Sequence, residues 1–362
     1  MSPGPHIVRP LESITARVML CPAYNVLASA WMLTTTDDYS GLDEWVERTA
    51  ASLPAERAER SHLIFEGLFD AAVLIEQDPP WPDFPAYLAD LATRSPQLLR
   101  DRFLHRLIAV AAPIEIPDSA HLLADRAAYL DLVRAAIPGR SHDLDLHAQA
   151  HALLNDPPAM QALIVEHLGW LWDHALADEW ARVAPLLGES ADLYAAVDLS
   201  GQSVLDAVRT VTGRNLDHLP TDEVRAVEHL TFIPSAHVGP YLVFFSGQGM
   251  LYVVFGARHP AGLSSGSADL TRVELLGLLD ALADDTRLRI LEWVARSGEQ
   301  FAQDIMTRFD LSQSAASRHL RQLSAAGFLV ERRQGGASKA YHLNGERLRE
   351  VTAALEVLLL RH

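Results

Sequence analysis

Apolar residues recur every three or four positions over most of the chain between about residues 23 and 211. Helix-stopping sequences interrupt this spacing, among them Asp78-Pro79-Pro80 and Asp156-Pro157-Pro158. A period near 3.6 is typical of amphipathic helices, and we expect roughly seven to nine of them, each about two to five turns long.

The helical period changes in four short stretches, of which the first alternates with period two. The first is Ile14–Leu20, and three more cover residues 230–235, 241–245 and 250–255. Alternation with period two is typical of strands with one buried face, and we expect the early strand to join the later three in a small antiparallel sheet. The predicted fold class is therefore mainly α with a small antiparallel sheet (α+β).

A segment rich in Gly, Ser and Pro at His259–Ala268 has no apolar period and separates two differently patterned regions. The chain has 362 residues, which exceeds the usual size of a single hydrophobic core. We therefore expect an N-terminal domain over residues 1–262, a linker over 263–268 and a C-terminal domain over 269–362.

The C-terminal region has the order helix, short turn, polar helix and hairpin. Asp284 or Asp285 is expected to cap one helix, with Leu288, Leu291 and Val294 facing inward and Arg287 and Arg289 facing outward. Ser312 is expected to cap the polar helix, whose residues Ala316, Leu320 and Leu323 share one apolar face. This order predicts a winged helix-turn-helix, in which one helix enters the DNA major groove.

The opposite face of the polar helix carries side chains suited to reading base edges. Gln pairs with adenine, Arg pairs with guanine, and Ser donates to either a base or a phosphate. The hairpin after Phe328 adds cations expected to follow the phosphates. The predicted DNA contacts are Ser312, Gln313, Ser314, Ser317, Arg318 and Arg321 of the helix, with Arg332, Arg333 and Lys339 of the hairpin.

The segments LADDTRLRIL at 282–291 and SQSAASRHL at 312–320 resemble the ArsR/SmtB family of small bacterial repressors. The resemblance covers about the last quarter of the chain and implies base contacts from the polar helix, backbone contacts from the wing, and dimerisation. It adds His319 to the DNA-contacting residues, although His319 could instead brace the helix. Pro234–Gly239 resembles an element of an uncharacterised domain found ahead of such regulators.

The last helix, expected at Gly345–Leu360, carries an apolar stripe that a lone winged helix has little core to cover. Pairing with a second chain would cover it and match a pseudo-palindromic DNA operator. The predicted dimer contacts are Leu270, Val273, Leu348, Val351, Leu355 and Leu358.

Charge is divided unevenly along the chain. The net charge is −17, yet residues 270–362 carry 13 basic and 12 acidic residues, and residues 312–339 have a net charge of +4. Phosphate binding needs a local positive patch, so the acidic remainder is expected to restrict how DNA approaches. One cysteine, no long apolar run and no secretory leader pattern predict a cytoplasmic protein without a membrane partner.

The resembled family includes metal sensors, but the side chains that bind metal in those sensors are missing here. The helix at 301–309 has no cysteine, and a tetrahedral site needs about four donors. His142, His147 and His151 could bind one ion, but a surface helix in a chain with sixteen histidines is the favoured explanation.

An apolar or aromatic small-molecule effector is the remaining expectation, with Trp170, Trp172 and His174 as candidate pocket residues, although aromatic residues also fill cores. No catalytic constellation, nucleotide motif or cofactor site is evident. The sequence predicts a homodimeric DNA-binding regulator, most simply a repressor. A DNA-binding protein whose N-terminal domain recruits a protein partner is the alternative.

Overall fold

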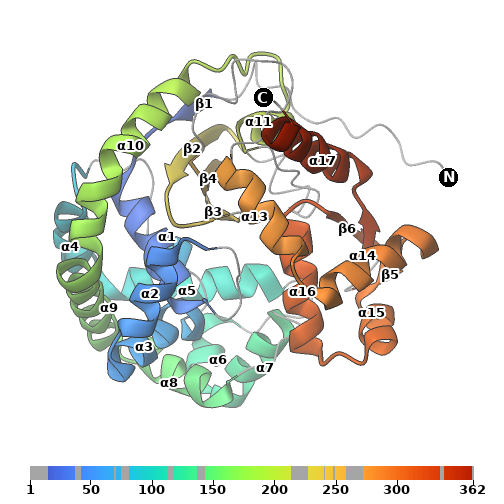
Figure 1. Cartoon of the computed structure of the whole chain (residues 1–362). Coiled ribbons are helices and arrows are strands. Elements are labelled where there is room, and N and C mark those ends of the chain that lie inside the picture. Colours follow the sequence, from blue (N-terminus) through green and yellow to red (C-terminus); the bar gives the residue numbers. More distant parts are fainter. Residues whose placement is uncertain are drawn as a thin grey trace. The chain divides into compact units, whose positions relative to one another are not determined.

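A computed structural model of the chain describes most of its residues (Figure 1). The described residues are 15–36, 42–68, 71–74, 81–111, 118–136, 143–212, 227–239, 241–247, 249–257, 272–334 and 338–360. Two compact units are present. A helical unit comprises residues 21–36 and 44–184, and a mixed unit comprises residues 1–20, 37–43 and 185–362. The predicted linker 263–268 lies outside the described residues, and the domain boundaries beside it stay predictions.

The helical unit is built around a helix that is buried on nearly all sides. This helix, α1 (Pro22–Thr34), packs against α2, α3 and α4. Its polar groups are satisfied locally, because Ser29 Oγ donates to the Asn25 carbonyl at 2.7 Å and Thr34 Oγ1 donates to the Ala30 carbonyl at 2.9 Å. A helix that is apolar all round is stable only inside a core, so α1 is the centre of this unit.

Further helices follow α1 along the chain. They are α2 (Glu44–Ser52), α3 (Ala55–His62), η2 (Leu63–Gly67), η3 (Ala71–Leu74), α4 (Phe84–Thr93), α5 (Pro96–Ala111), α6 (Ser119–Ala124), α7 (Arg126–Ala136), α8 (Leu144–Leu154), α9 (Pro157–Leu171), η4 (Trp172–Leu176) and α10 (Ala177–Ala195). With α11 (Val204–Thr212), the described residues hold eleven α-helices up to residue 212, more than predicted. Single-residue breaks explain the difference, since Asp125 alone separates α6 from α7.

A buried histidine in the helical unit makes its stability depend on pH. His167 is fully buried, and its Nε2 lies 2.9 Å from Ser61 Oγ. Burial, followed by the nearby Arg57 charge, lowers the pKa of His167 from 6.5 to about 4. Its contribution to stability is therefore complete above pH 6.5 and is lost as pH falls toward 4.

We expect the free energy of unfolding to fall by about 2 kcal/mol more in the wild type than in His167→Gln between pH 7 and pH 5. Urea titrations at the two pH values measure this difference. His174→Gln, at an exposed position, is the control and should keep the wild-type dependence. An equal fall in the free energy of unfolding in the wild type and in His167→Gln would contradict the lowered pKa of His167.

The mixed unit contains a four-stranded sheet of order β1-β2-β4-β3, made of β1 (Thr15–Val18), β2 (His229–Ser235), β3 (Leu242–Gly247) and β4 (Met250–Gly256). The early strand joins the later three as predicted, but the sheet is mixed. β1 and β4 both run parallel to β2, and only β3 is antiparallel, to β4. Long connections permit parallel pairing, and the chain between β1 and β2 includes most of the helices.

Apolar side chains of α11 cover one face of this sheet. Val204, Val208 and Val211 belong to one buried cluster with Phe232 of β2 and Phe255 of β4. The 3.6-residue stripe of a helix meets the alternating residues of two strands, which is the usual way a sheet face is buried.

The C-terminal part of the mixed unit is a winged helix, as predicted. Its elements are α13 (Arg272–Leu282), α14 (Asp285–Ser297), β5 (Gln300–Phe301), α15 (Ala302–Phe309), α16 (Gln313–Ala325), β6 (Leu329–Gln334), β7 (Ser338–Leu343) and α17 (Gly345–Leu360). Its core includes Ile290, Ile305, Leu323 and Phe328, each 0% exposed. The short strand β5 was not predicted; it extends the hairpin to an antiparallel sheet of order β5-β7-β6.

Candidate nucleic-acid interface

The polar helix α16 begins after a sharp turn. Asp310 ends α15 in the left-handed region at φ 52°. Ser312 then caps α16, because its Oγ accepts a hydrogen bond from the Ala315 amide at 3.2 Å. The turn and the cap together set the start of α16, as the sequence predicted.

One face of α16 is buried and the opposite face is polar. Ala316, Leu320 and Leu323 are at most 2% exposed and pack into the winged-helix core. The exposed residues from the cap onward include Ser312, Gln313, Ser314, Ser317 and Arg318, whereas Arg321 is half-buried. These residue types can donate to bases and phosphates, so the exposed face is suited to a DNA groove.

His319 does not lie on that exposed face. It is 6% exposed, and its Nδ1 lies 3.8 Å from Asp284 Oδ1 at the start of α14. Burial, only partly offset by the Asp284 charge, lowers the pKa of His319. The expected DNA contact of His319 is wrong, because a buried ring cannot reach a base edge, and its charged neighbour is Asp284 of α14 and not the helix at 301–309 that bracing predicts.

The wing is the antiparallel hairpin of β6 and β7. Its register places Arg332 opposite Ala340 and Arg333 opposite Lys339. The side chains of these three cations and the tip at residues 335–337 lie outside what the structure describes. Their phosphate contacts stay predictions, although the register brings two of the cations to one rung of the hairpin.

The packing face of α14 differs from the predicted one. Asp284 caps the helix as expected, accepting from the Arg287 amide at 2.8 Å. However, Arg287 is only 9% exposed, whereas Leu288 is 48% exposed. Arg287 shares a helix face with Leu291 and Val294, four and seven residues later, and this spacing could have identified it.

Part of the predicted dimer surface is instead core of the same chain. Val351 is 4% exposed, and Leu348 and Leu355 pack against the same buried cluster. Leu270 and the Val273 side chain lie outside the described part. The large exposed apolar side chains on α13 and α17 are Leu276 (57%), Leu358 (48%) and Leu359 (64%).

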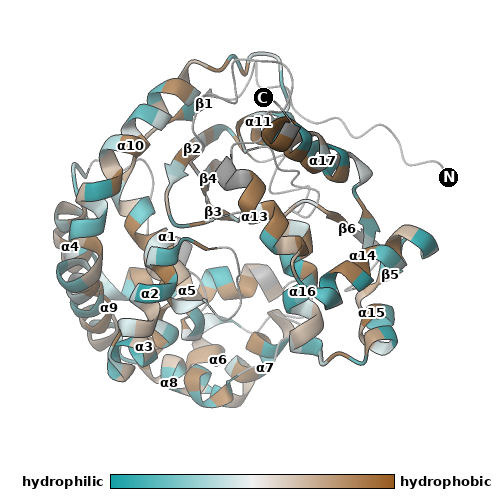
Figure 2. Cartoon of the chain, in the orientation of Figure 1, coloured by the Kyte–Doolittle hydropathy of each residue, from teal (hydrophilic) through white to brown (hydrophobic). Residues whose placement is uncertain are grey.

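These exposed leucines lie on two helices that pack against each other, α13 and α17. Figure 2 shows apolar residues along much of α17. The helices therefore present leucines that the described residues of the chain leave uncovered.

The described residues contain no group of three or more His, Cys, Asp or Glu side chains that could hold a metal ion. His147 Nδ1 lies 3.2 Å from the Gly67 carbonyl and His151 Nε2 lies 3.0 Å from the Leu122 carbonyl, and both rings are buried. Hydrogen bonds to two different backbone segments account for this pair, and His142 lies outside the described residues.

The candidate pocket residues Trp170, Trp172 and His174 do not surround one common space. Trp170 stacks on His174 with ring centres 4.5 Å apart and also lies under the Arg57 guanidinium. Trp172 contacts Phe84 instead, with ring centres 5.2 Å apart. Because each ring packs on a different partner, their arrangement supports packing rather than one shared pocket.

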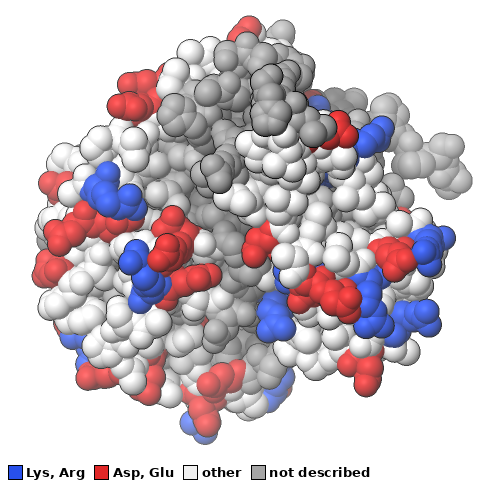
Figure 3. Space-filling model, in the orientation of Figure 1, with Lys and Arg blue, Asp and Glu red and all other residues white. Residues whose placement is uncertain are grey.

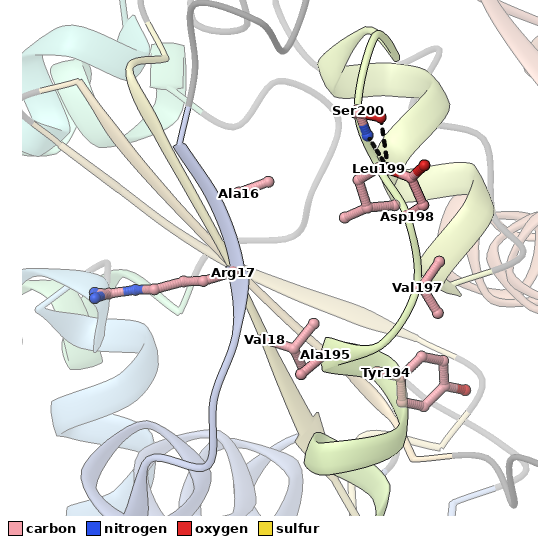
Figure 4. Close-up of a pocket in the computed structure, with 9 residues that line it drawn as sticks. All are labelled: Ala16, Arg17, Val18, Tyr194, Ala195, Val197, Asp198, Leu199 and Ser200. Carbon is pink, nitrogen blue, oxygen red and sulfur yellow. Dashed lines mark hydrogen bonds between the residues drawn. The ribbon is translucent and has the colours of Figure 1, made fainter.

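A cavity of about 400 Å³ lies beside the edge strand β1 in the mixed unit (Figure 4). It is lined by Ala16, Arg17, Val18, Tyr194, Ala195, Val197, Asp198, Leu199 and Ser200. Ala16 and Val18 point toward the 197–200 segment, whereas the Arg17 side chain points away and donates to Thr231 Oγ1 at 3.2 Å. Hydrogen bonds from Ser200 lower the pKa of Asp198, which keeps this carboxylate charged at one end of the cavity.

Charged side chains are mixed on the surface. On the face seen in Figure 3, acidic and basic groups alternate and do not form one large patch. Among the helices of the described residues, none is both long and apolar enough to cross a membrane.

Comparison with known proteins identifies the winged-helix part. A family model for bacterial regulatory proteins of the arsR family matches residues 284–330. Over 54 residues the chain is 48% identical to the arsenic resistance transcriptional regulator ArsR1 of Pseudomonas putida, covering 15% of this chain and 42% of that regulator. It is 43% identical over 58 residues to the arsenical resistance operon repressor of Escherichia coli, covering 16% and 50%.

A longer match is to the arsenical resistance operon repressor of Staphylococcus xylosus, 34% identical over 85 residues, covering 24% of this chain and 80% of the repressor. The chain thus spans half or less of the first two relatives and most of the third. A solved fragment of a possible transcriptional regulatory protein of Mycobacterium bovis is 27% identical, with a TM-score of 0.20, over 24% of this chain and 92% of the fragment. The resemblance at Pro234–Gly239 stays a prediction.

Proposed function

The chain belongs to the ArsR family of bacterial regulatory proteins, and we propose that it is a homodimeric transcriptional repressor that binds double-stranded DNA through α16. The exposed polar face of α16 carries this proposal. Ser312, Gln313, Ser317 and Arg318 are all exposed beside a hairpin that contains three more cations. A regulator with this arrangement needs no catalytic residues.

In the proposed complex, the N-terminal turns of α16 enter the major groove. Gln313, Arg318 and Arg321 read base edges, and the serines and the wing cations contact phosphates. The remainder of the chain is strongly acidic, so it repels DNA and favours the approach in which α16 faces the groove.

Selection of binding sites from a random DNA pool with the full-length chain tests this function. We expect a pseudo-palindromic site to be enriched, and its affinity to fall steeply as salt rises because bound phosphates release counterions. Failure to enrich any sequence, or an affinity that does not change with salt concentration, would contradict the proposed function.

We place the dimer contact on the exposed leucines of α13 and α17. Leu276, Leu358 and Leu359 are each about half exposed or more. A two-fold axis beside these helices would bury the same leucines of both chains and repeat α16 on one side of the dimer. The pseudo-palindrome of the operator follows from that symmetry.

We propose further that a non-metal small molecule controls DNA binding from the cavity beside β1. Ala16, Val18 and Leu199 offer an apolar wall, and the Asp198 carboxylate offers one charged end. A small apolar or aromatic molecule with a hydrogen-bond donor fits these features. If a compound from a small-molecule screen releases the wild type from DNA but not Ala16→Trp, the site is supported. Equal release of both proteins refutes it.

Arsenite, cadmium and zinc should leave operator affinity unchanged. The chain has a single cysteine, Cys21, which is buried, so it cannot provide a multi-thiolate site within one chain. Mobility-shift titrations at micromolar metal measure the effect, with an arsenic-resistance repressor as the responding control. A tenfold or greater loss of affinity would show that another donor set exists.

A further inference from the structure

Arg287 joins three helices of the winged helix inside its core. Its Nε donates to the Ala281 carbonyl at 2.6 Å and its Nη2 donates to the Asp280 carbonyl at 2.9 Å. Its Nη1 donates to Gln322 Oε1 at 2.6 Å. A side chain of α14 thus joins the end of α13 to the last turn of α16 with one planar group.

Gln322 is buried one turn after Arg318, on the side of α16 that contacts Arg287. It is 6% exposed and lies between the core residues Leu320 and Leu323 in sequence. Because Arg318 and Gln322 are four residues apart on one helix, a tilt of α16 at Gln322 moves Arg318 with it.

The two backbone acceptors lie at the C-terminal end of α13. Carbonyls in the last turn of a helix lack partners within that helix, and that end carries partial negative charge. The guanidinium donates to two of them, of which the Asp280 carbonyl also accepts from the Ala283 amide at 3.0 Å, and the Asp284 carboxylate lies 3.9 Å away. The buried cation is therefore compensated by directional acceptors from two helices.

We infer that Arg287 and Gln322 are a positioning pair, which holds α16 at a fixed angle to α13. This inference rests on the proposed function, because α16 is the proposed reading helix and α13 carries part of the proposed dimer surface. The pair then sets the distance and tilt between the two reading helices of the dimer without touching DNA.

Holding α16 at a fixed angle requires the planar guanidinium of Arg287. Lysine would keep the positive charge but could not place donors on three acceptors in one plane. Methionine would fill similar volume without any donor. Glutamate at position 322 would keep an acceptor oxygen at the same place, and it serves as the conservative variant.

We expect Arg287→Met, Arg287→Lys and Gln322→Met to lower operator affinity by about tenfold, because a tilted α16 loses about one base contact of roughly 1–3 kcal/mol. Affinity for unrelated DNA should stay within about twofold, because phosphate contacts tolerate a tilted helix. Gln322→Glu should keep most of the operator preference. Arg296→Met, at an exposed position on α14, is the matched control.

All affinities are measured where circular dichroism shows each variant fully folded, so lost stability alone leaves the ratio of operator to unrelated-DNA affinity unchanged. An unchanged ratio in Arg287→Met and Gln322→Met overturns the inference, even if their melting temperatures fall.

Distances between spin labels on α13 and α16 test the angle between these two helices in the absence of DNA. Gly277 on α13 is exposed and a side chain there meets nothing within 4 Å, and Ser317 is exposed on α16. We expect the distance distribution between labels at Gly277→Cys and Ser317→Cys, in a Cys21→Ala chain diluted with unlabelled protein, to broaden in Arg287→Met and Gln322→Met. A distribution as narrow as that of the parent overturns the inference. If the parent chain binds no DNA, the proposed function fails, and the label distances still decide the positioning role.

Discussion

Replacing Arg318 and Arg321 together by alanine should reduce operator affinity by about a hundredfold, since each well-placed base contact contributes about 1–3 kcal/mol. Arg318 is exposed on the proposed reading face and Arg321 lies one turn later, half-buried. Affinity for unrelated DNA should fall much less, because the three wing cations remain. Equilibrium titrations with the selected operator and with a scrambled duplex measure the two losses separately.

The double variant is expected to fold normally, because neither side chain belongs to the buried winged-helix core. Arg349→Ala is the control, which removes one exposed cation on α17. Footprints of the double variant that match the wild type would remove α16 from the reading role. A similar loss in Arg349→Ala would indicate a general charge effect instead.

Replacing Leu358 and Leu359 together by aspartate should convert the dimer to a monomer. Two carboxylates per chain would be placed where apolar side chains meet across the two-fold axis, which costs far more than the contacts gain. A monomer binds one half-site at a time, so operator affinity should fall by at least about a hundredfold. Sedimentation equilibrium and operator titration measure the two effects on the same samples.

Two single variants test whether the loss of the dimer comes from the proposed surface. Leu98→Asp, at a leucine of α5 that is 62% exposed, matches Leu359 in exposure and should stay dimeric. Leu355→Asp should instead lower the melting temperature, because Leu355 packs against the core of its own chain. If the Leu358 and Leu359 double variant remains a dimer, the pairing surface lies elsewhere in the chain.

Most elements of the winged helix were predictable because their determinants are close in sequence. A capping carboxylate or hydroxyl acts within three residues, as Asp284 and Ser312 do. The apolar spacing of α16 likewise identified Ala316, Leu320 and Leu323 as core. Period-two alternation identified β1, and short apolar runs bounded by turn residues identified β2, β3 and β4 for the same reason.

Partners far apart in sequence were not predictable in the same way. The apolar spacing of α14 is compatible with burial of either Leu288 or Arg287. Arg287 is the buried one because its guanidinium donates to acceptors on α13 and α16. His319 was ambiguous until Asp284 was placed beside it. The direction of β1 depends on the long connection to β2, about which period-two alternation contains no information.

The sequence by itself determined the order of the winged-helix elements, the capping residues of α14 and α16, the apolar face of α16, and that metal-sensing thiolates are missing. These properties depend on residue type and on spacing within a few turns. Only the tertiary structure decided that Arg287 and Gln322 are joined, that His319 is buried, and that Leu358 and Leu359 remain exposed while Val351 is covered. Those outcomes depend on which helices pack together, and a buried polar group reveals its role only when its distant partner is in place.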